Sequence, residues 1–417
     1  MKIANSETCV PTNPSPTQRL LASFFVATIA FLCLIGNTSN LGATVNNKNF
    51  PTFPAIQTNV DFWEKIYTTY STSEAVIHDK YDLTKIYGVI PIVDYLQPGA
   101  KRLNEPLLEA AKQKYCAILT HIAQGGPPVT KEERRIAAMF QGARKSQLER
   151  ASESVRVQIG QKERFMEGVV RSKAYLHEIK RILRSYDLPE ELAYLPHVES
   201  SFNPDAYSKA GASGLWQFTR STGKQYLRID HAVDERQDPL KATHAAAKFL
   251  KRNHSVLGNW PLALTAYNCG TSGMARAKKD KGSYEKIFLE YEVGHFKFAS
   301  RNYYPEFLAA LQAAQKFEQK TFSRPLQSAP LTTVRLTKRA SIDDISRHFK
   351  VDISTIKTLN PAINQLISQE KRDLPQGYEL KLPATAYNSK KQIVTTQANT
   401  QANSNDQKNR PQTIVQK

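Results

Sequence analysis

Apolar side chains recur every three or four residues along much of the chain, the spacing of helices with one buried face. Residues 165–183 carry such a face, made of Phe165, Val169, Leu176, Ile179 and Leu183. Residues 107–122 repeat it with Leu107, Leu108, Ala111, Ile118 and Ile122. Thr130 and Glu133 have the spacing of a capping box, which starts a helix. The pattern predicts a mainly α protein, with a helical N-terminal region over residues 62–164 and a mostly helical domain over residues 165–320.

The pattern changes after residue 320. Residues 321–333 are rich in Pro, Ser and Thr and predict a linker. Within residues 334–384 we expect a strand at 334–336, a helix capped by Ser341, a second helix ended by Asn360, and a closing strand through Tyr378, Leu380 and Leu382. This is a small β-α-α-β module. Residues 385–417 have few apolar side chains and predict a disordered tail.

The N-terminus carries an uncharged apolar run at residues 20–36, preceded by Arg19. Its length and position predict a signal peptide or membrane anchor within residues 1–43, and a buried core helix is the alternative. Residues 44–61 are polar and rich in Asn and Pro, which predicts a linker. We therefore expect export to the periplasm or cell envelope, with association to the inner or outer membrane through the N-terminus.

The net charge and the Cys and His content limit which macromolecules, metals or cofactors this protein is expected to bind. The formal net charge is +19, from 57 Lys and Arg against 38 Asp and Glu, which favours a polyanionic partner such as nucleic acid, a membrane face or the cell wall. No nucleic-acid-binding motif is present, so we expect no nucleic-acid partner. Cys116 and Cys269 either form one disulfide or are separate core residues. The nine His show no zinc-ligand spacing, and we expect neither metal nor cofactor.

The richest chemistry lies in residues 187–223. Asp187 and Pro189 open a predicted helix with Leu192, Leu195 and Val198 on its buried side, and Pro196 is expected to kink it. Glu199 then falls in the last turn, before a loop. A carboxyl beside an apolar face loses hydration, which raises its pKa toward the ~6 of comparable glycosidase sites. Such a group donates a proton near neutral pH.

Further polar residues follow at loop and helix ends. Gly211 and Gly214 allow tight turns close to a ligand. We expect the Ser208 hydroxyl and the Gln217 amide to turn toward the acid and orient substrate. Tyr267 and Asn268 precede Gly270, where a helix is expected to end. Taken singly, a solvated Glu and a Tyr-Asn helix end are the plainer interpretations.

Taken together, the blocks Glu-Ser-Ser-Phe-Asn-Pro-Asp-Ala-Tyr-Ser (199–208), Gly-Ala-Ser-Gly-Leu-Trp-Gln (211–217) and Ala-Tyr-Asn-Cys-Gly (266–270) resemble the soluble-lytic-transglycosylase catalytic domain family. The resemblance covers residues 165–318 and implies a lysozyme-like fold of the goose type. It implies that Glu199 is the catalytic acid/base and that Ser208, Gln217, Tyr267 and Asn268 line the cleft. The implied product is a 1,6-anhydro-muramic acid end on peptidoglycan, formed without water.

The resemblance extends to two further places with departures. A family block Glu-Thr-Arg-x-Tyr appears at residues 299–303, where Arg301 and Tyr303 match and are expected to bind substrate, whereas Ala299 replaces the glutamate. The module at 334–384 is similar to a LysM module, a binder of N-acetylglucosamine-containing glycans. Its usual Gly-Asp-Thr turn is replaced here by residues 338–340, Lys-Arg-Ala.

A single acid must suffice in this interpretation. Ordinary glycosidases use two carboxylates, yet Asp205 is typical of a turn, and Asp230, Asp234 and Asp238 lie in a polar loop. One carboxyl is enough if the substrate's own hydroxyl attacks. Three alternatives follow in order: a goose-lysozyme-like hydrolase, a non-catalytic peptidoglycan-binding protein, and a nucleic-acid binder motivated by charge alone.

Overall fold

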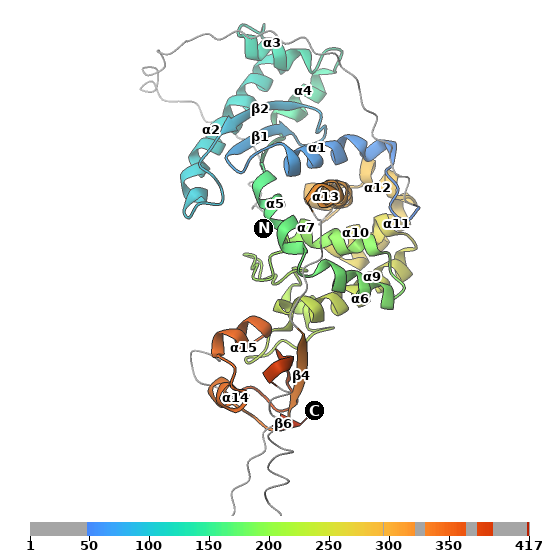
Figure 1. The fold of residues 1–417 in the computed structure, drawn as a ribbon. Coiled ribbons are helices and arrows are strands. Elements are labelled where there is room, and N and C mark those ends of the chain that lie inside the picture. The colour runs from blue at the N-terminus through green and yellow to red at the C-terminus, as the bar shows by residue number, and fades with distance from the viewer. Residues whose placement is uncertain (1–47, 295, 322–329, 364–372, 387–414, 417) are drawn as a thin grey trace, which may run out of the picture. The chain divides into compact units, whose positions relative to one another are not determined.

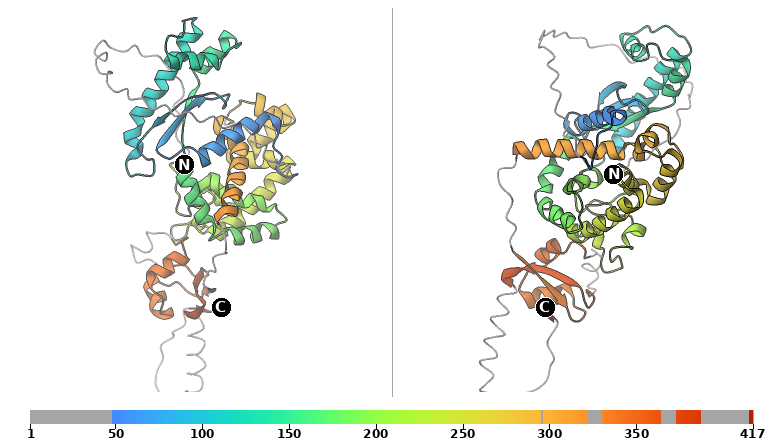
Figure 2. Two further views of the ribbon diagram at one scale, coloured as in Figure 1. Left: turned by 45° about the horizontal axis from the view of Figure 1, so that its top comes forward. Right: turned by 90° about the vertical axis from the view of Figure 1, so that its right-hand side faces the viewer.

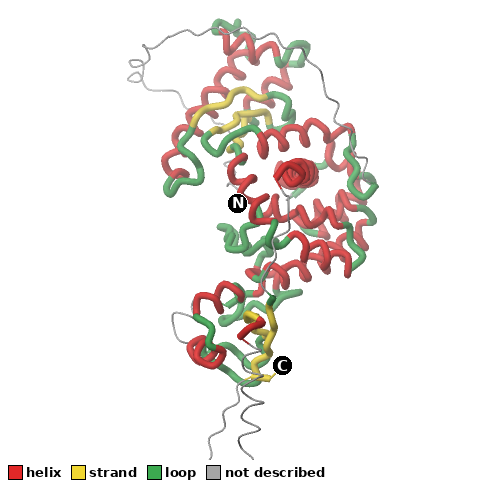
Figure 3. Tube along the Cα trace, in the orientation of Figure 1, coloured by secondary structure: helices red, strands yellow, loops and turns green. Residues whose placement is uncertain are grey.

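The computed structural model describes residues 48–294, 296–321, 330–363, 373–386 and 415–416 (Figure 1). Its contacts divide the chain into two units. The N-terminal unit comprises the described residues up to 163 together with 277–309, and the site unit comprises 164–276 with the described residues from 310 onward. Helices make up most of both units, as expected for a mainly α protein (Figure 3).

The N-terminal unit is a small sheet covered by helices. Its elements are α1 (Gln57–Thr68), β1 (Glu74–Asp79), β2 (Ile86–Pro91), α2 (Ala100–Ala123), α3 (Lys131–Ala138), α4 (Lys145–Ser152), β3 (Val155–Ile159), α12 (Tyr284–Glu290) and the start of α13 (Phe298–Thr321). The sheet order is β2-β1-β3, with both pairings antiparallel. Ile77, Tyr87, Tyr115 and Leu119 share one core between the strands and the helices.

Three expectations for this unit need correction. The helical pattern predicted no strands here, yet β1, β2 and β3 form a sheet. Ala75, Val76 and Ile77 of β1 are fully buried, and the period of such a short apolar run does not distinguish a strand from a helix. α2 buries Ala111, Tyr115 and Leu119, whereas Leu107 of the predicted face is exposed.

The predicted linker at residues 44–61 is also partly wrong. α1 begins at Gln57, and Ile56 and Val60 are fully buried. Phe50 packs on Phe307 with ring centroids 5.3 Å apart. The capping box predicted from Thr130 and Glu133 is confirmed at the start of α3.

The site unit begins with a helical body. Its elements are α5 (Lys162–Ser172), α6 (Leu176–Ser185), the 3-10 helix η3 (Glu190–Tyr194), α7 (Leu195–Ser200), α8 (Arg220–Gly223), the 3-10 helix η4 (Glu235–Gln237), α9 (Pro239–Leu257), α10 (Trp260–Cys269) and α11 (Thr271–Lys281). The face predicted over residues 165–183 is shared by α5 and α6. α6 and α10 both pack on α9, where Ala242, Ala246 and Leu250 are fully buried.

The β-α-α-β module is confirmed within the same unit. It consists of β4 (Leu331–Leu336), α14 (Ile342–Phe349), α15 (Ile353–Leu359) and β5 (Glu379–Pro383), which can be followed in Figure 2. Ser341 caps α14 by accepting a hydrogen bond from the Asp344 N–H at 3.0 Å. The Asn360 amide binds the Lys381 backbone in both directions at 2.8 Å, which ties the end of α15 to β5.

The module extends beyond its predicted limits at both ends. β4 starts at Leu331, inside the predicted linker 321–333, because Leu331, Thr332 and Thr333 pair with β5. In the predicted disordered tail, β6 (Val415–Gln416) pairs with the other edge of β4. Residues 1–43, predicted to be a signal peptide or anchor, lie outside the described residues. No helix in the described part of the chain is both long and apolar enough to cross a membrane.

Candidate active site

Glu199 lies in the last turn of α7, as predicted. The helix predicted to start near Pro189 is instead divided into η3 and α7, with Pro196 in the first turn of α7. Proline is tolerated there because the first-turn N–H groups have no intrahelical partner. Pro196 therefore begins a helix and does not kink one. Glu199 itself is partly buried.

The residues after Glu199 are fixed by side chains from two other segments. Ser201 and Phe202 have positive φ angles of 52° and 53°, a conformation that neighbouring contacts must stabilise. The Ser200 hydroxyl donates to the Leu215 carbonyl at 2.8 Å. Arg171 on α5 donates to the Ser201 carbonyl at 2.9 Å. The end of α7 is therefore tied both to α5 and to the loop formed by residues 206–218, which we call the site loop.

Tyr267 on α10 is electrostatically coupled to Glu199. Burial, followed by the Glu199 carboxylate, raises the pKa of the Tyr267 phenol well above its ordinary value. The phenol donates a hydrogen bond to the Trp216 carbonyl at 2.8 Å. The Trp216 indole in turn donates to Thr243 on α9 at 2.9 Å. Tyr267 thus stays neutral near the acid and fastens the site loop to the helical body.

Ser208 and Gln217 both bind the backbone of the site loop. The Ser208 hydroxyl accepts from the Ala212 N–H at 2.9 Å. The Gln217 amide nitrogen donates to the Ala206 and Gly214 carbonyls at 3.0 and 2.8 Å. The amide donors expected to face substrate are therefore engaged within the loop, and substrate contact by Ser208 and Gln217 stays a prediction.

The end of α10 follows the sequence pattern. Gly270 caps the helix at a φ of 89°, as predicted, and Asn268 is partly buried in the last turn. Cys269 is not disulfide-bonded, and its thiol donates to the Thr265 carbonyl at 3.3 Å. A Cys116–Cys269 disulfide is therefore not formed.

Arg301 and Tyr303 belong to the N-terminal unit, on α13. The Arg301 guanidinium donates to the Tyr291 carbonyl at 2.9 Å and pairs with Glu292 at 3.0 Å. Burial lowers the pKa of Arg301, an effect that the Glu292 carboxylate opposes. The Tyr303 side chain is buried. Both residues serve the packing of their own unit, and their predicted contact with substrate stays a prediction.

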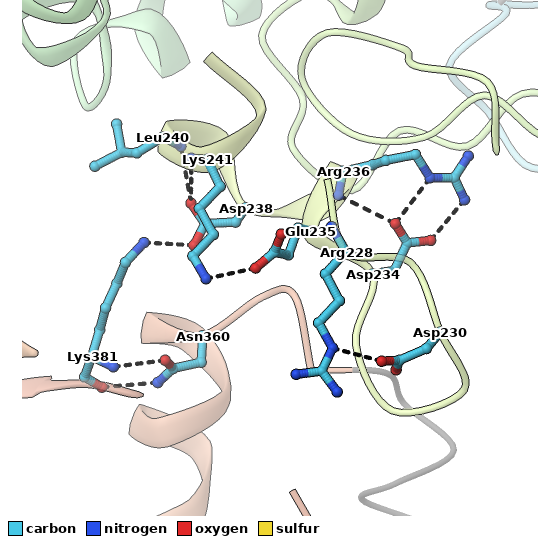
Figure 4. Close-up of polar contacts among 10 residues, drawn as sticks. All are labelled: Arg228, Asp230, Asp234, Glu235, Arg236, Asp238, Leu240, Lys241, Asn360 and Lys381. Carbon is cyan, nitrogen blue, oxygen red and sulfur yellow. Dashed lines mark hydrogen bonds and ion pairs between the residues drawn. The ribbon is translucent and has the colours of Figure 1, made fainter. Parts of the chain in front are cut away.

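Arg236 is a functional candidate that the sequence did not reveal. Its side chain is 3% exposed and is held by both carboxylate oxygens of Asp234, at 2.9 and 2.7 Å (Figure 4). Its Nη1 donates to the carbonyls of Gly211 and Phe218 in the site loop, at 2.7 and 3.0 Å. In sequence this segment is only a polar loop, because nothing local distinguishes a buried Asp-x-Arg pair from a solvated one.

His197 is buried two residues before the acid, and within the described part of the chain neither of its ring nitrogens has a hydrogen-bond partner. The rings of Phe202, Phe165 and Tyr194 surround it, with centroids 4.5, 5.0 and 6.2 Å away. Burial, and then the positive charge of Arg171, lower the pKa of His197 to about 3. The imidazole is therefore neutral in the folded protein at physiological pH.

Acidification is expected to destabilise the protein through His197. Because the folded pKa is about 3 and the ordinary value is 6.5, the unfolded chain binds the extra proton below pH 6.5. The stability contribution is complete above pH 6.5 and falls by about 2 kcal/mol between pH 6.5 and 5. In the N-terminal unit, burial also lowers the pKa of His78 to about 3, so His78 adds to the loss of stability at low pH.

Chemical denaturation between pH 8 and 5 checks this expectation. His197→Phe should reduce the pH-dependent loss of unfolding free energy by about 2 kcal/mol at pH 5, leaving the share of His78. An identical pH dependence in wild type and variant would contradict a neutral, buried His197.

Among the described residues, no group of three or more His, Cys, Asp or Glu side chains is arranged to hold a metal ion.

Known proteins resemble this region. Residues 178–289 match the family model of the transglycosylase SLT domain. The chain is 28% identical over 218 residues to membrane-bound lytic murein transglycosylase D of Escherichia coli K12, covering 49% of this chain and 47% of that protein. It is 39% identical over 109 residues to a putative tributyltin chloride resistance protein of Alteromonas sp. strain M-1, covering 26% of this chain and 53% of that protein.

A solved structure is also similar, namely the lytic transglycosylase Slt of Pseudomonas aeruginosa in an inactive mutant form. It has 22% sequence identity and a TM-score of 0.30, covering 36% of this chain and 25% of that one. The chain spans about half the length of the curated relatives above. The family match includes Glu199, the site loop and Tyr267. Residues 178–289 of this chain are therefore similar to the transglycosylase SLT domain.

Proposed function

We propose that this protein is a peptidoglycan lytic transglycosylase, which cleaves the β-1,4 bond between MurNAc and GlcNAc and leaves 1,6-anhydroMurNAc ends. The observation that carries the proposal is the position of Glu199. It lies within the matched SLT domain, at a helix end fixed by Ser200 and Arg171, where its carboxylate adds to burial in raising the pKa of the Tyr267 phenol. Ser208, Gln217, Tyr267, Asn268, Arg301 and Tyr303 are the proposed substrate-binding residues.

Glu199 would act first as acid and then as base. Its carboxyl protonates the oxygen that bridges MurNAc and GlcNAc, and the C1–O bond breaks. The substrate's N-acetyl group stabilises the positive charge that develops at C1. The resulting carboxylate then accepts the proton of the C6 hydroxyl as that oxygen attacks C1, which restores the acid and forms the anhydro ring. No second carboxylate is needed, in contrast to ordinary glycosidases.

Mass spectrometry of digested sacculi tests the reaction. Incubation with the protein should release muropeptides lighter by one water than the corresponding reducing-end products. Reducing ends would instead support the alternative, a lysozyme-type hydrolase on the same fold. Binding to sacculi without released fragments would support a non-catalytic peptidoglycan-binding protein.

The remaining assignments concern location and partners. Several relatives are named membrane-bound lytic murein transglycosylases. With the apolar run at residues 20–36, this supports export to the periplasm or cell envelope. The net charge of +19 suits the peptide carboxylates of the wall, and we propose no nucleic-acid partner. The LysM-like module at residues 334–384 is proposed to bind glycan.

A further inference from the structure

The C-terminal module shares its core with one segment of the helical body. Ala232 and Val233, which precede α9, are buried in the same apolar cluster as Leu336, Ile356 and Leu380 of the module. Val233 forms a β-bridge with Ile363. The Asp234 N–H donates to the Ala362 carbonyl at 2.8 Å. We call residues 228–238 the docking segment, because the module packs directly on it.

An ion pair strengthens this contact (Figure 4). The Lys381 ammonium on β5 lies 2.6 Å from Asp238, whose side chain is only 4% exposed. The other Asp238 oxygen caps α9 by accepting from the Leu240 and Lys241 N–H groups at 3.0 and 3.1 Å. Asp238 therefore joins the module to the start of α9, and the low exposure of the pair favours a defined geometry over a loose surface contact.

The opposite side of the docking segment holds the site loop. Asp234, whose N–H binds the module, orients Arg236 with two charge-assisted hydrogen bonds. Arg236 then binds the Gly211 and Phe218 carbonyls, near both ends of the loop turn that carries Gly214 and Gln217. A Cβ added to Gly214 would lie 1.8 Å from the carbonyl oxygen of Arg236, so only glycine fits there. Module, docking segment and site loop are thus in continuous contact.

We propose that the module is a positioning element for the site loop and acts through the docking segment, in addition to any glycan that it binds. The catalytic consequence rests on the function proposed above. A tethering module raises the local concentration of substrate, so its loss raises KM on polymeric wall. A positioning element holds reacting groups in place, so its loss lowers kcat even on a short soluble glycan.

The test uses the full chain with changes at Lys381. Lys381→Ala removes the ion pair and Lys381→Glu places a second carboxylate beside Asp238, whereas Lys381→Arg keeps the charge. Lys357→Ala, on the exposed face of α15, is the matched control for loss of one lysine from the same module. Two quantities are measured: hydrogen exchange of the amides at residues 206–218, and kcat and KM on a soluble GlcNAc-MurNAc tetrasaccharide and on sacculi.

The expected result is a change at the site loop. Lys381→Glu should speed amide exchange there by about tenfold and lower kcat on the tetrasaccharide by about 3- to 10-fold, with KM nearly unchanged. Lys381→Ala should show the same trend, and Lys381→Arg and Lys357→Ala should match wild type. Unchanged loop exchange in Lys381→Glu, or an effect confined to KM on sacculi, would overturn the proposal.

The two proposals fail in different ways. If neither wild type nor Glu199→Gln releases product from either substrate, the proposed enzymatic function is wrong. The exchange measurement still decides the coupling in that case, because it needs no turnover. Faster exchange at residues 206–218 in Lys381→Glu and Lys381→Ala, but not in Lys357→Ala, then supports a structural link between the module and the loop, and exchange equal to that of wild type overturns it.

Discussion

Glu199→Gln is expected to lower the rate of anhydro-product release by at least ~10³-fold. The amide keeps the size of the carboxyl, but it neither donates the proton that the departing sugar oxygen needs nor accepts the proton of the C6 hydroxyl. Because Glu199 would perform both transfers, its replacement removes the acid and the base together. The measurement is the initial rate of muropeptide release from sacculi, with products resolved by mass spectrometry.

The control is Glu190→Gln in η3, which changes the same chemical group nearby. Glu190 is 43% exposed and pairs with Arg184 at 2.6 Å, so its change should leave the rate close to that of wild type. Binding of the Glu199→Gln variant to sacculi should persist, because the substitution changes one carboxyl to an amide of the same size and leaves the rest of the surface unchanged. Near-normal turnover by Glu199→Gln would refute the assignment of the acid.

Gly214→Ala is expected to lower kcat by about 10²-fold, the magnitude associated with small displacements of positioned groups. Gly214 has a φ of 78°, and an added Cβ would lie 1.8 Å from the Arg236 carbonyl, a backbone atom that has no rotamer to escape into. The site loop or the docking segment must therefore move. Since Gln217 binds the Gly214 carbonyl and Ser200 binds Leu215, the displacement reaches the end of α7.

Gly211→Ala separates the two contributions of this substitution. Gly211 has a similar φ of 76°, but a Cβ there would meet only the Tyr207 hydroxyl at 3.7 Å, an ordinary contact. It therefore carries the backbone cost, on the order of 1–2 kcal/mol, without the collision. Unfolding free energies and kcat of both variants give the comparison. Equal losses of kcat would mean that the contact with Arg236 does not set the loop position.

A continuous set of contacts holds the helix end that carries Glu199. Tyr267 fastens the Trp216 carbonyl, Ser200 fastens Leu215, and Arg236 fastens Gly211 and Phe218. Rigid support is needed because a group that transfers a proton in both directions must stay within hydrogen-bond reach of two different oxygens. Glu199 itself remains partly exposed, which suits access to the proposed polymeric substrate.

Several features could be predicted from local sequence because a few neighbouring residues encode them. Thr130 with Glu133, and Ser341 with Asp344, supply helix caps through contacts three residues apart, and both were found in the structure. Gly270 ends α10 because it adopts a positive φ without steric cost. The module could be predicted in the same way, since alternation at Tyr378, Leu380 and Leu382 and the stop at Asn360 are local patterns.

Other features were decided only by contacts between distant segments. β1 was not predicted because its central apolar residues are buried by strands and helices on both sides, so the alternation typical of a half-buried strand is absent. The Gln217 amide was expected to face substrate, but the fold of the loop places the Ala206 and Gly214 carbonyls within its reach.

By itself, the sequence determined the helix caps, the helix end that carries Glu199, and the motif blocks that resemble the SLT family, because each depends on neighbours along the chain. Only the tertiary structure decided that the Asp234–Arg236 ion pair is shielded from solvent and holds the site loop. It also decided that Lys381 pairs with Asp238, 143 residues away in sequence. The physical reason is that a charge is buried or solvated according to what packs around it, and that environment comes from distant segments.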